Sequence, residues 1–411
     1  MLMSSLPSTS KTSKFAVIGG GSSSSGSSSL NRSGENSSLN TSLNKNNNSN
    51  TNGGLNGSLF SKSQPPEKLT PINAPSASSS SSYAELERHL VQYMHSSTKV
   101  LAALQKFVRN NLELKRSSNY KCKKTDSPNI ILDVLDLHCD DEDIVTQSLK
   151  TLRILARKKQ NRENVSLRLV QSISRILQEN KDQNAEIASE GSNVLLNICF
   201  EGRNISSLSN TNCVPALVEL LFDSQNKEVL LAAVGALQSI SFQDIGRKMI
   251  TEANGIPKLC KLLKYNNKDV QKKTISTIHN LTSDIVVVQI IHELGEIPSI
   301  IALLKQNSIA IASSAAGCLQ NISRVDKARD AIQENNGTAV LTTAIFSTED
   351  PTLQVNSIGA LLNILGSSMD EKDIQQRKAL KKILSMCLLV GQLKSMTEDL
   401  EDDSEFLEVE D

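Results

Sequence analysis

The chain has 411 residues, with 44 basic and 44 acidic side chains, 3% aromatic residues and no Trp. A neutral chain lacks the basic stripe that nucleic-acid binding requires, and no apolar run reaches the 18 residues of a membrane span, so neither function is expected. The seven Cys residues form no Cys-x-x-Cys pair, which favours a reducing compartment and predicts a cytoplasmic protein, with nuclear shuttling left open.

Residues 1–82 have the composition of a disordered, low-complexity tail. They contain 26 Ser, 11 Asn and 8 Gly, too few apolar groups to offset the conformational entropy of folding. A Ser-rich, acid-poor N-terminus also resembles an organellar transit peptide, which is the less favoured alternative. We predict that this segment is dispensable for folding.

Residues 83–125 are expected to cap the first repeat of the array that follows. Apolar residues such as Leu86, Leu90, Val100 and Leu104 recur at helical spacing, which predicts one or two helices. A stack of repeats needs an end whose outer face is polar, and this segment suits that task.

Residues 126–366 contain a short phrase that recurs every 41 or 42 positions, at 213–221, 255–263 and 296–304. Pro215, Pro257 and Pro298 fit the first turn of a helix, where no N–H is required. Gly255 and Gly295, which stand just before two of these prolines, and Gly337 in the next, weakened copy are expected to stop the preceding helix and reverse the chain. A shorter helix precedes each turn, over Ile245–Thr251, Ile285–Glu293 and Val325–Glu334. Each repeat therefore holds three helices.

A second phrase follows each copy of the first, at 235–241, 317–323 and 359–364. Its most regular feature is a ladder of polar residues spaced by 41 or 42, namely Asn197, Ser239, Asn280, Asn321 and Asn363. An earlier copy, at 149–156, has Ile154 at that position. Repeats of this length stack to bury apolar faces that one unit cannot bury alone.

These phrases resemble the armadillo repeat, with a consensus similar to that of β-catenin and plakophilin. The resemblance implies an all-α, right-handed superhelical solenoid of about six repeats, each of three helices, with capping helices at both ends. It also implies that the third helices line a concave groove, where Asn side chains pair with the backbone of an extended peptide. The alternative is that these Asn side chains satisfy backbone groups of neighbouring helices.

The chain departs from importin-α, whose groove carries a tryptophan array one turn before the Asn ladder. The equivalent positions here are small or polar: Asn193, Gly235, Ser276, Gly317 and Gly359. This argues against recognition of basic signals, and favours a bulkier or apolar partner element lying against the glycines. Tight helix packing is an equally good reason for these glycines.

The candidate partner-binding residues are the ladder itself with a basic spot beside it. They are Asn197, Ser239, Asn280, Asn321 and Asn363, together with Lys272, Lys273 and His279 at the start and end of one third helix. A solvated helix face is the alternative reading of the two lysines. No His-Glu-x-x-His or Gly-x-Ser-x-Gly motif is present, so we expect no catalytic residue, no metal site and no cofactor.

The C-terminal part is expected to contain a capping helix at 367–397 and an acidic, disordered tail at 398–411. The tail carries nine acidic and no basic residues, and we hypothesise that it folds back onto the groove.

The sequence thus predicts a non-enzymatic scaffold or adaptor that holds an extended or helical segment of a protein partner. A regulatory effector that binds a small GTPase or a chaperone is the alternative, and a transport carrier is less favoured. A small-molecule ligand is not expected.

Overall fold

The structure, a computed structural model, describes residues 83–111, 128–163, 165–180, 184–223, 226–366 and 369–404, with backbone alone at 222–223 and 390–404. All of them belong to one compact unit, Leu59–Asp411. The expected disordered segment 1–82, residues 112–125 of the expected N-terminal cap and the end of the acidic tail lie outside these ranges.

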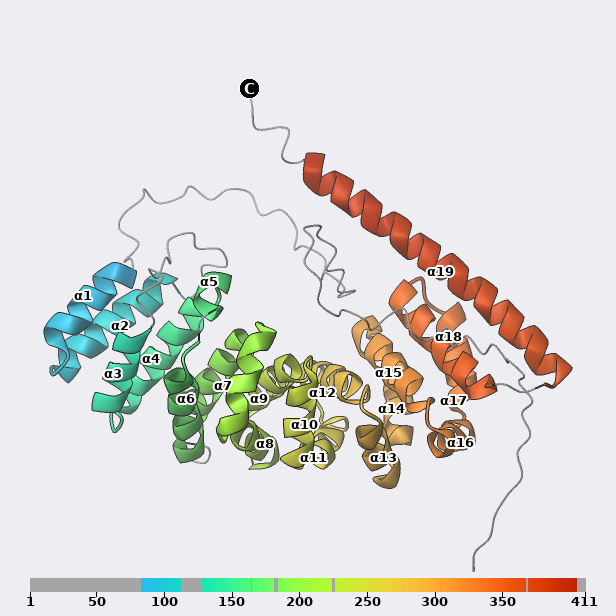
Figure 1. Cartoon of the computed structure of the whole chain (residues 1–411), viewed down its shortest axis with the longest axis horizontal. Helices are drawn as coiled ribbons and strands as arrows, with labels where there is room; N and C mark the ends of the chain where they lie inside the picture. Colours follow the sequence, from blue (N-terminus) through green and yellow to red (C-terminus); the bar gives the residue numbers. More distant parts are fainter. Residues whose placement is uncertain are drawn as a thin grey trace, which may run out of the picture. The chain divides into compact units, whose positions relative to one another are not determined.

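One row of helices runs through the molecule, and each member packs against the next (Figure 1). We call its six main members the third helices: α4 (Glu142–Leu155), α7 (Ala185–Ile198), α9 (Lys227–Ile240), α12 (Lys268–Leu281), α15 (Ile309–Ile322) and α18 (Pro351–Leu365). At the N-terminal end α2 (Ser97–Asn111), paired with α1 (Tyr83–Tyr93), packs on α4 and starts the row. Helices are therefore present where the N-terminal cap was expected, and α2 occupies the place of a further third helix.

The remaining helices complete the repeats behind this row. They are α3 (Asn129–Leu137), α5 (Lys159–Arg162), α6 (Leu167–Asn180), the 3-10 helix η1 (Gly202–Asn210), α8 (Cys213–Asp223), α10 (Asp244–Glu252), α11 (Gly255–Leu262), α13 (Ile285–Glu293), α14 (Ile297–Leu304), α16 (Asp326–Glu334) and α17 (Gly337–Phe346). The short helices predicted before the turns at Gly255, Gly295 and Gly337 are α10, α13 and α16, and each predicted end agrees within one residue. Every element in the described part of the chain is helical, which confirms the all-α repeat fold.

The third helices begin with side-chain caps that sequence reasoning missed. Asp or Asn precedes five of the six, and its side chain accepts hydrogen bonds from first-turn N–H groups; these residues are Asp141, Asn184, Asn226, Asn267 and Asp350. Such caps satisfy donors that have no partner within the helix. They recur with the period of the repeat and fix where each third helix starts.

The turn between first and second helices differs from expectation at two of three repeats. Gly295 has φ of 68°, as predicted, but at the other two turns the left-handed residues are Asn254 and Asn336, each with φ of 57°. Gly255 and Gly337 are instead the first helical residues. A Cβ on Gly255 would lie 2.9 Å from the carbonyl oxygen of Ile250, so this glycine allows close packing of α10 against α11.

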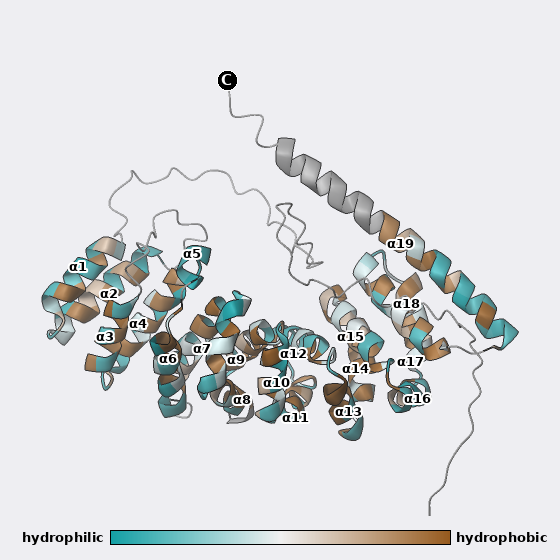
Figure 2. Cartoon of the chain, viewed as in Figure 1, coloured by the Kyte–Doolittle hydropathy of each residue, from teal (hydrophilic) through white to brown (hydrophobic). Residues whose placement is uncertain are grey.

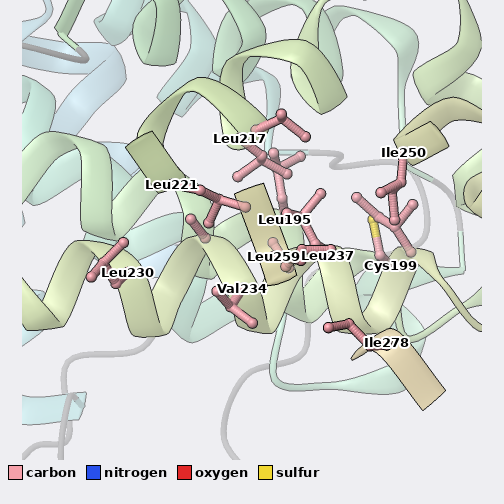
Figure 3. Packing of buried hydrophobic residues seen from close by; sticks show 14 of the residues in the cluster. Leu195, Cys199, Leu217, Leu221, Leu230, Val234, Leu237, Ile250, Leu259 and Ile278 are labelled. Atoms are coloured by element: carbon pink, nitrogen blue, oxygen red, sulfur yellow. The ribbon is translucent and has the colours of Figure 1, made fainter. Parts of the chain in front are cut away.

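The core between the helix layers is almost entirely aliphatic. Leu195 of α7, Leu217 of α8 and Leu237 of α9 are fully buried beside one another (Figure 3). Figure 2 shows that most helices mix apolar and polar residues, whereas α13 is strongly apolar and α16 strongly polar. Small and branched side chains fill the narrow spaces between stacked helices, which explains how the fold does without Trp.

The last helix, α19 (Glu371–Ser404), packs against α18. Leu380 and Cys387 are buried at this contact, and the Cys387 thiol donates to Gln354 Oε1 at 3.2 Å. The helical backbone continues to Ser404, so residues 398–404 of the expected disordered tail are helical. Residues 405–411 lie outside the described residues.

Candidate protein-binding surface

The five ladder residues lie near the C-terminal ends of five successive third helices, from α7 to α18. Asn197, Asn280, Asn321 and Asn363 are half-buried, whereas Ser239 is buried. Because each third helix packs on the next, the ladder residues follow one another at intervals of one repeat. The structure thus places them on the same face.

The asparagine amides are bound to the preceding repeat. Asn321 Nδ2 lies 3.4 Å from the carbonyl oxygen of His279 and 3.2 Å from Thr282 Oγ1. Asn363 Nδ2 lies 3.0 Å from both the carbonyl oxygen of Gln320 and Ser323 Oγ. A carbonyl oxygen can only accept, so the NH2 end of each side chain must point back along the stack.

A buried hydroxyl completes each of three such contacts. Ser241, Thr282 and Ser323 are fully buried and follow the ladder position by two residues. Each donates to a carbonyl oxygen three residues before it, at 2.7–2.8 Å, and accepts from the next Asn; Asn280 Nδ2 lies 2.9 Å from Ser241 Oγ. We call the three pairs Ser241–Asn280, Thr282–Asn321 and Ser323–Asn363 the amide–hydroxyl junctions.

The N-terminal repeats lack these junctions. Asn197 Nδ2 donates to the carbonyl oxygen of Arg153 at 3.1 Å, but Ala156 stands where a hydroxyl is needed. In the following repeat Cys199 stands at the hydroxyl position, and the ladder residue that would face it is Ser239 instead of Asn. In the sequence a Ser or Thr stands two residues after the ladder position wherever a junction forms to the next repeat. This pattern could have predicted the junctions, which the ladder positions alone do not.

In each amide–hydroxyl junction the Asn side chain donates through Nδ2, and its Oδ1 takes no part. Within the described residues, Oδ1 of Asn280, Asn321 and Asn363 accepts no hydrogen bond, and none of these atoms is buried from solvent. Asn321 and Asn363 have committed both amide hydrogens, whereas Asn280 has committed one. The Nδ2 donors of these asparagines therefore satisfy the preceding repeat, which is the structural interpretation of the ladder. Their Oδ1 acceptors remain available.

The glycines one turn before the ladder serve helix packing. A Cβ on Gly235 would lie 2.6 Å from Leu196 Cδ1. A Cβ on Gly317 would overlap the ring of His279, and one on Gly359 would overlap the Gln320 amide. Each glycine is thus covered by a side chain of the preceding third helix, which supports the packing interpretation over an open shelf for a partner.

The predicted basic residues do not form a single exposed spot. Helix α12 begins at Lys268, so Lys272 and Lys273 lie in its second turn. Lys272 is exposed, but Lys273 is half-buried close to Gly235, and burial lowers the pKa of its ammonium. Burial likewise lowers the pKa of His279, whose ring packs on Gly317.

The corresponding face of α4 and α7 carries ion pairs. Lys150 Nζ lies 2.6 Å from Glu186 Oε1, and Arg153 Nε lies 2.8 Å from Glu190 Oε2. Glu190 is only 8% exposed, and burial raises its pKa although Arg153 acts in the opposite direction. These charges are matched within the protein.

The described residues were compared with two other kinds of site, a metal site and a membrane span. No group of three His, Cys, Asp or Glu side chains there could hold a metal ion. No single helix in the same ranges is long and apolar enough to span a membrane; α13 and α14 reach that length only together, across a bend of 98°.

Stacked three-helix repeats with a polar ladder along the third helices define an armadillo-type repeat protein, and solved structures agree. An engineered protein matches with a TM-score of 0.59 at 21% identity, over 74% of each chain. A computationally designed armadillo repeat protein for modular peptide recognition matches with a TM-score of 0.50 at 20% identity, over 58% of this chain and 99% of its own. A designed armadillo repeat protein in complex with the peptide (KR)4 gives 0.51 at 21% identity, over 58% and 100%.

The sequence comparison identifies the family. Residues 81–390 match the family described as Kinesin-associated protein (KAP), and the chain belongs to it. No curated protein matches the chain in sequence.

Proposed function

We propose that this protein is a non-catalytic, cytoplasmic adaptor that binds a kinesin motor chain and holds an extended segment of it on the third helices α12, α15 and α18. Membership of the kinesin-associated family supports the choice of partner. One observation supports the surface: the row of available Oδ1 acceptors on Asn280, Asn321 and Asn363.

The junctions make this row a preorganised acceptor array. Each Nδ2 is bound to the preceding repeat, so the side chain is already ordered before a partner arrives. Ordering a mobile side chain on binding costs about 0.5–1.5 kcal/mol, which is avoided here. Backbone N–H groups of a peptide are the donors that such carbonyl oxygens accept, whatever the peptide sequence.

The spacing suits an extended chain. Packed helices lie about 8–10 Å apart, and an extended chain advances about 3.3–3.6 Å per residue. One acceptor therefore meets about every second or third residue of the partner. Side chains between these points decide specificity, because the ladder reads only the backbone.

The test is co-purification of the full chain with co-expressed kinesin motor chains. Three Asn→Ala changes on the ladder should weaken association about tenfold or more, at about 0.5–1.5 kcal/mol for each hydrogen bond; they are Asn280→Ala, Asn321→Ala and Asn363→Ala. Three helix-cap changes of the same chemical kind serve as the control, because they remove side-chain hydrogen bonds at the N-terminal ends of α7, α9 and α12, away from the ladder; they are Asn184→Ala, Asn226→Ala and Asn267→Ala.

Association that is lost only in the ladder variant supports both the partner and the surface. Equal effects of the two variants would mean that the ladder is structural only. Failure of the unmodified chain to associate with any kinesin motor chain would overturn the adaptor proposal, and capture of a small GTPase instead would favour the effector alternative.

A further inference from the structure

The third helices from α9 to α18 carry almost no charge beyond their first turns. Helices α15 and α18 contain no Lys, Arg, Asp or Glu. On α9 and α12 the first two residues have opposite charges, and Lys227 Nζ lies 3.6 Å from a carboxylate oxygen of Asp269. Past the first turn, Lys272 and Lys273 of α12 are the only such residues on these four helices. Neither makes an ion pair or a hydrogen bond with another residue that the structure describes.

The Lys273 ammonium is half-buried beside a glycine of the preceding third helix. A Cβ on Gly235 would lie 3.4 Å from Lys273 Nζ and 2.6 Å from Leu196 Cδ1. Because Gly235 has no side chain, the ammonium has room at this point. Gly235 precedes the ladder residue Ser239 by four residues, which is about 6 Å along the helix axis. The cation is therefore held next to the ladder, at the joint between α9 and α12.

The charge of Lys273 is unmatched within the described residues. Burial lowers the pKa of its ammonium, the charge of Lys272 lowers it further, and Asp269 acts in the opposite direction. On α7 the equivalent residue is Glu190, since both stand seven residues before the ladder residue of their helix. Arg153 matches the charge of Glu190 at 2.8 Å. A half-buried cation without such a partner costs free energy of folding, and a bound anion would supply the missing match.

The ladder residue of α12 also has more free hydrogen-bonding capacity than the two that follow it. Asn280 Nδ2 donates to Ser241 Oγ alone, so one amide hydrogen and Oδ1 are both available. Asn321 and Asn363 keep only Oδ1. A side chain that donates and accepts can bind both the C=O and the N–H of a peptide backbone. Two helical turns separate Asn280 from Lys273, so α12 presents the amide and the cation on the same face.

We propose that Lys273 binds an acidic side chain, Asp or Glu, of the partner segment held on the ladder, and that this contact fixes the register of the segment at α12. The inference rests on the proposed function, because the ladder must first hold the segment. A basic residue of the segment at this point would be repelled by Lys272 and Lys273 together. Since α15 and α18 carry no charge, α12 is the third helix of this row that selects for charge.

The test uses the full chain with co-expressed kinesin motor chains, and measures the dissociation constant of the purified complex. Lys273→Met keeps the apolar stem and removes the charge, so affinity should fall about tenfold, as expected for a charge-assisted contact. The melting temperature should stay equal or rise, because a desolvated charge is removed. Lys327→Met is the matched control: Lys327 is exposed on α16, behind the third helices, so the same change in net charge should alter affinity less than about twofold.

A charge exchange identifies the partner residue. Lys273→Glu should weaken association more than Lys273→Met, because it replaces attraction by repulsion. Single Asp and Glu residues of the motor chain are then changed to Lys. One of these changes should restore association with the Lys273→Glu variant, and it should weaken association with the unmodified chain.

Four results overturn the inference while the proposed function stands. They are unchanged affinity of Lys273→Met where the three ladder changes abolish association, equal losses for the Lys273 and Lys327 variants, a lower melting temperature of Lys273→Met, and the absence of any restoring change in the motor chain. Failure of the unmodified chain to associate with any kinesin motor chain is a different result, and it overturns the proposed function and this inference together.

Discussion

The joints between neighbouring third helices are built in two ways, and the difference separates the N-terminal from the C-terminal repeats. Between α4 and α7, Lys150 pairs with Glu186 and Arg153 with Glu190. From α9 to α18 the ladder side of the stack has neutral amides and hydroxyls, such as Thr282 with Asn321. The ion pair between α9 and α12, Lys227 with Asp269 at 3.6 Å, joins exposed side chains at the start of the two helices. Both side chains of an ion pair are engaged with each other. An Asn side chain that donates its Nδ2 hydrogens to the preceding repeat still has Oδ1 available as an acceptor. The successive asparagine carbonyl oxygens of the C-terminal joints are therefore the acceptors that the proposed partner segment would use.

The largest effect is expected from breaking the charged joint. Arg153→Met leaves the Glu190 carboxylate buried without its partner and should cost about 2–4 kcal/mol at neutral pH. Burial holds the folded pKa of Glu190 above its unfolded value near 4.3, so stability from this group is full at low pH and is lost as pH rises through the folded pKa. The loss should thus be larger at pH 7 than at pH 5, as measured by urea unfolding.

Lys150→Met is the matched control for this prediction. Its partner Glu186 has 59% of its side chain exposed, so the loss should stay below about 1 kcal/mol. An Arg153 variant with the same loss at both pH values would show that Glu190 does not depend on this pair.

The second expected effect compares the two kinds of asparagine. Asn321→Ala removes two hydrogen bonds and should cost about 2 kcal/mol, whereas Asn197→Ala removes one and should cost about 1 kcal/mol. Thermal or urea unfolding of the two variants measures the difference. Equal losses would mean that the Thr282 hydroxyl adds nothing to the joint.

A smaller effect is expected on acidification. Burial lowers the pKa of His279 below the unfolded value near 6.5, so the stability that it contributes is present above pH 6.5 and is lost as pH falls through the folded pKa. His279→Gln should reduce the drop in melting temperature between pH 7 and pH 5. Gln stands at the equivalent position in the neighbouring repeats, as Gln238 and Gln320, so the side chain fits. An unchanged pH profile in the variant would exclude His279 as a source of acid sensitivity.

The smallest effect is expected from transplanting a junction. Cys199→Ser combined with Ser239→Asn installs the missing hydroxyl and amide between α7 and α9, and should stabilise the chain by up to about 1 kcal/mol. Each single change is the control, since neither completes the bond alone. A double variant that is less stable than the sum of the single changes would show that this joint cannot adopt the C-terminal geometry.

The periodic signals in the sequence were enough to predict where the helices lie, but not which groups the ladder side chains bind. The Gly-x-x-Pro turns placed α13 at Ile285–Glu293 without error, because a proline in the first turn and a stop before it leave little choice. The left-handed residue of the turn was less predictable, since Asn and Gly both adopt that conformation and adjoin each other at Asn254–Gly255.

The candidate site was predicted as a set of positions, and its chemistry required the structure. Spacing identified Asn280, Asn321 and Asn363 as one ladder, yet it cannot show whether an amide points to a partner or to the preceding repeat. That choice depends on buried hydroxyls from another helix. The extent of α19 was missed because acidic composition was weighed above the 3-4-3-4 spacing of apolar residues from Met386 to Leu400.

The amide–hydroxyl junctions also bear on how such an array changes its length. Their partners are 39 or 40 residues apart in the sequence, close to the length of one repeat. A tandem duplication of one C-terminal repeat therefore brings a hydroxyl for the following unit and an amide for the preceding one, and leaves no buried donor unmatched. The Arg153–Glu190 pair is formed only between α4 and α7. Duplication of either repeat would therefore add a second Arg153 or Glu190 that has no partner of opposite charge. Gain and loss of whole repeats should accordingly be tolerated best between α9 and α18.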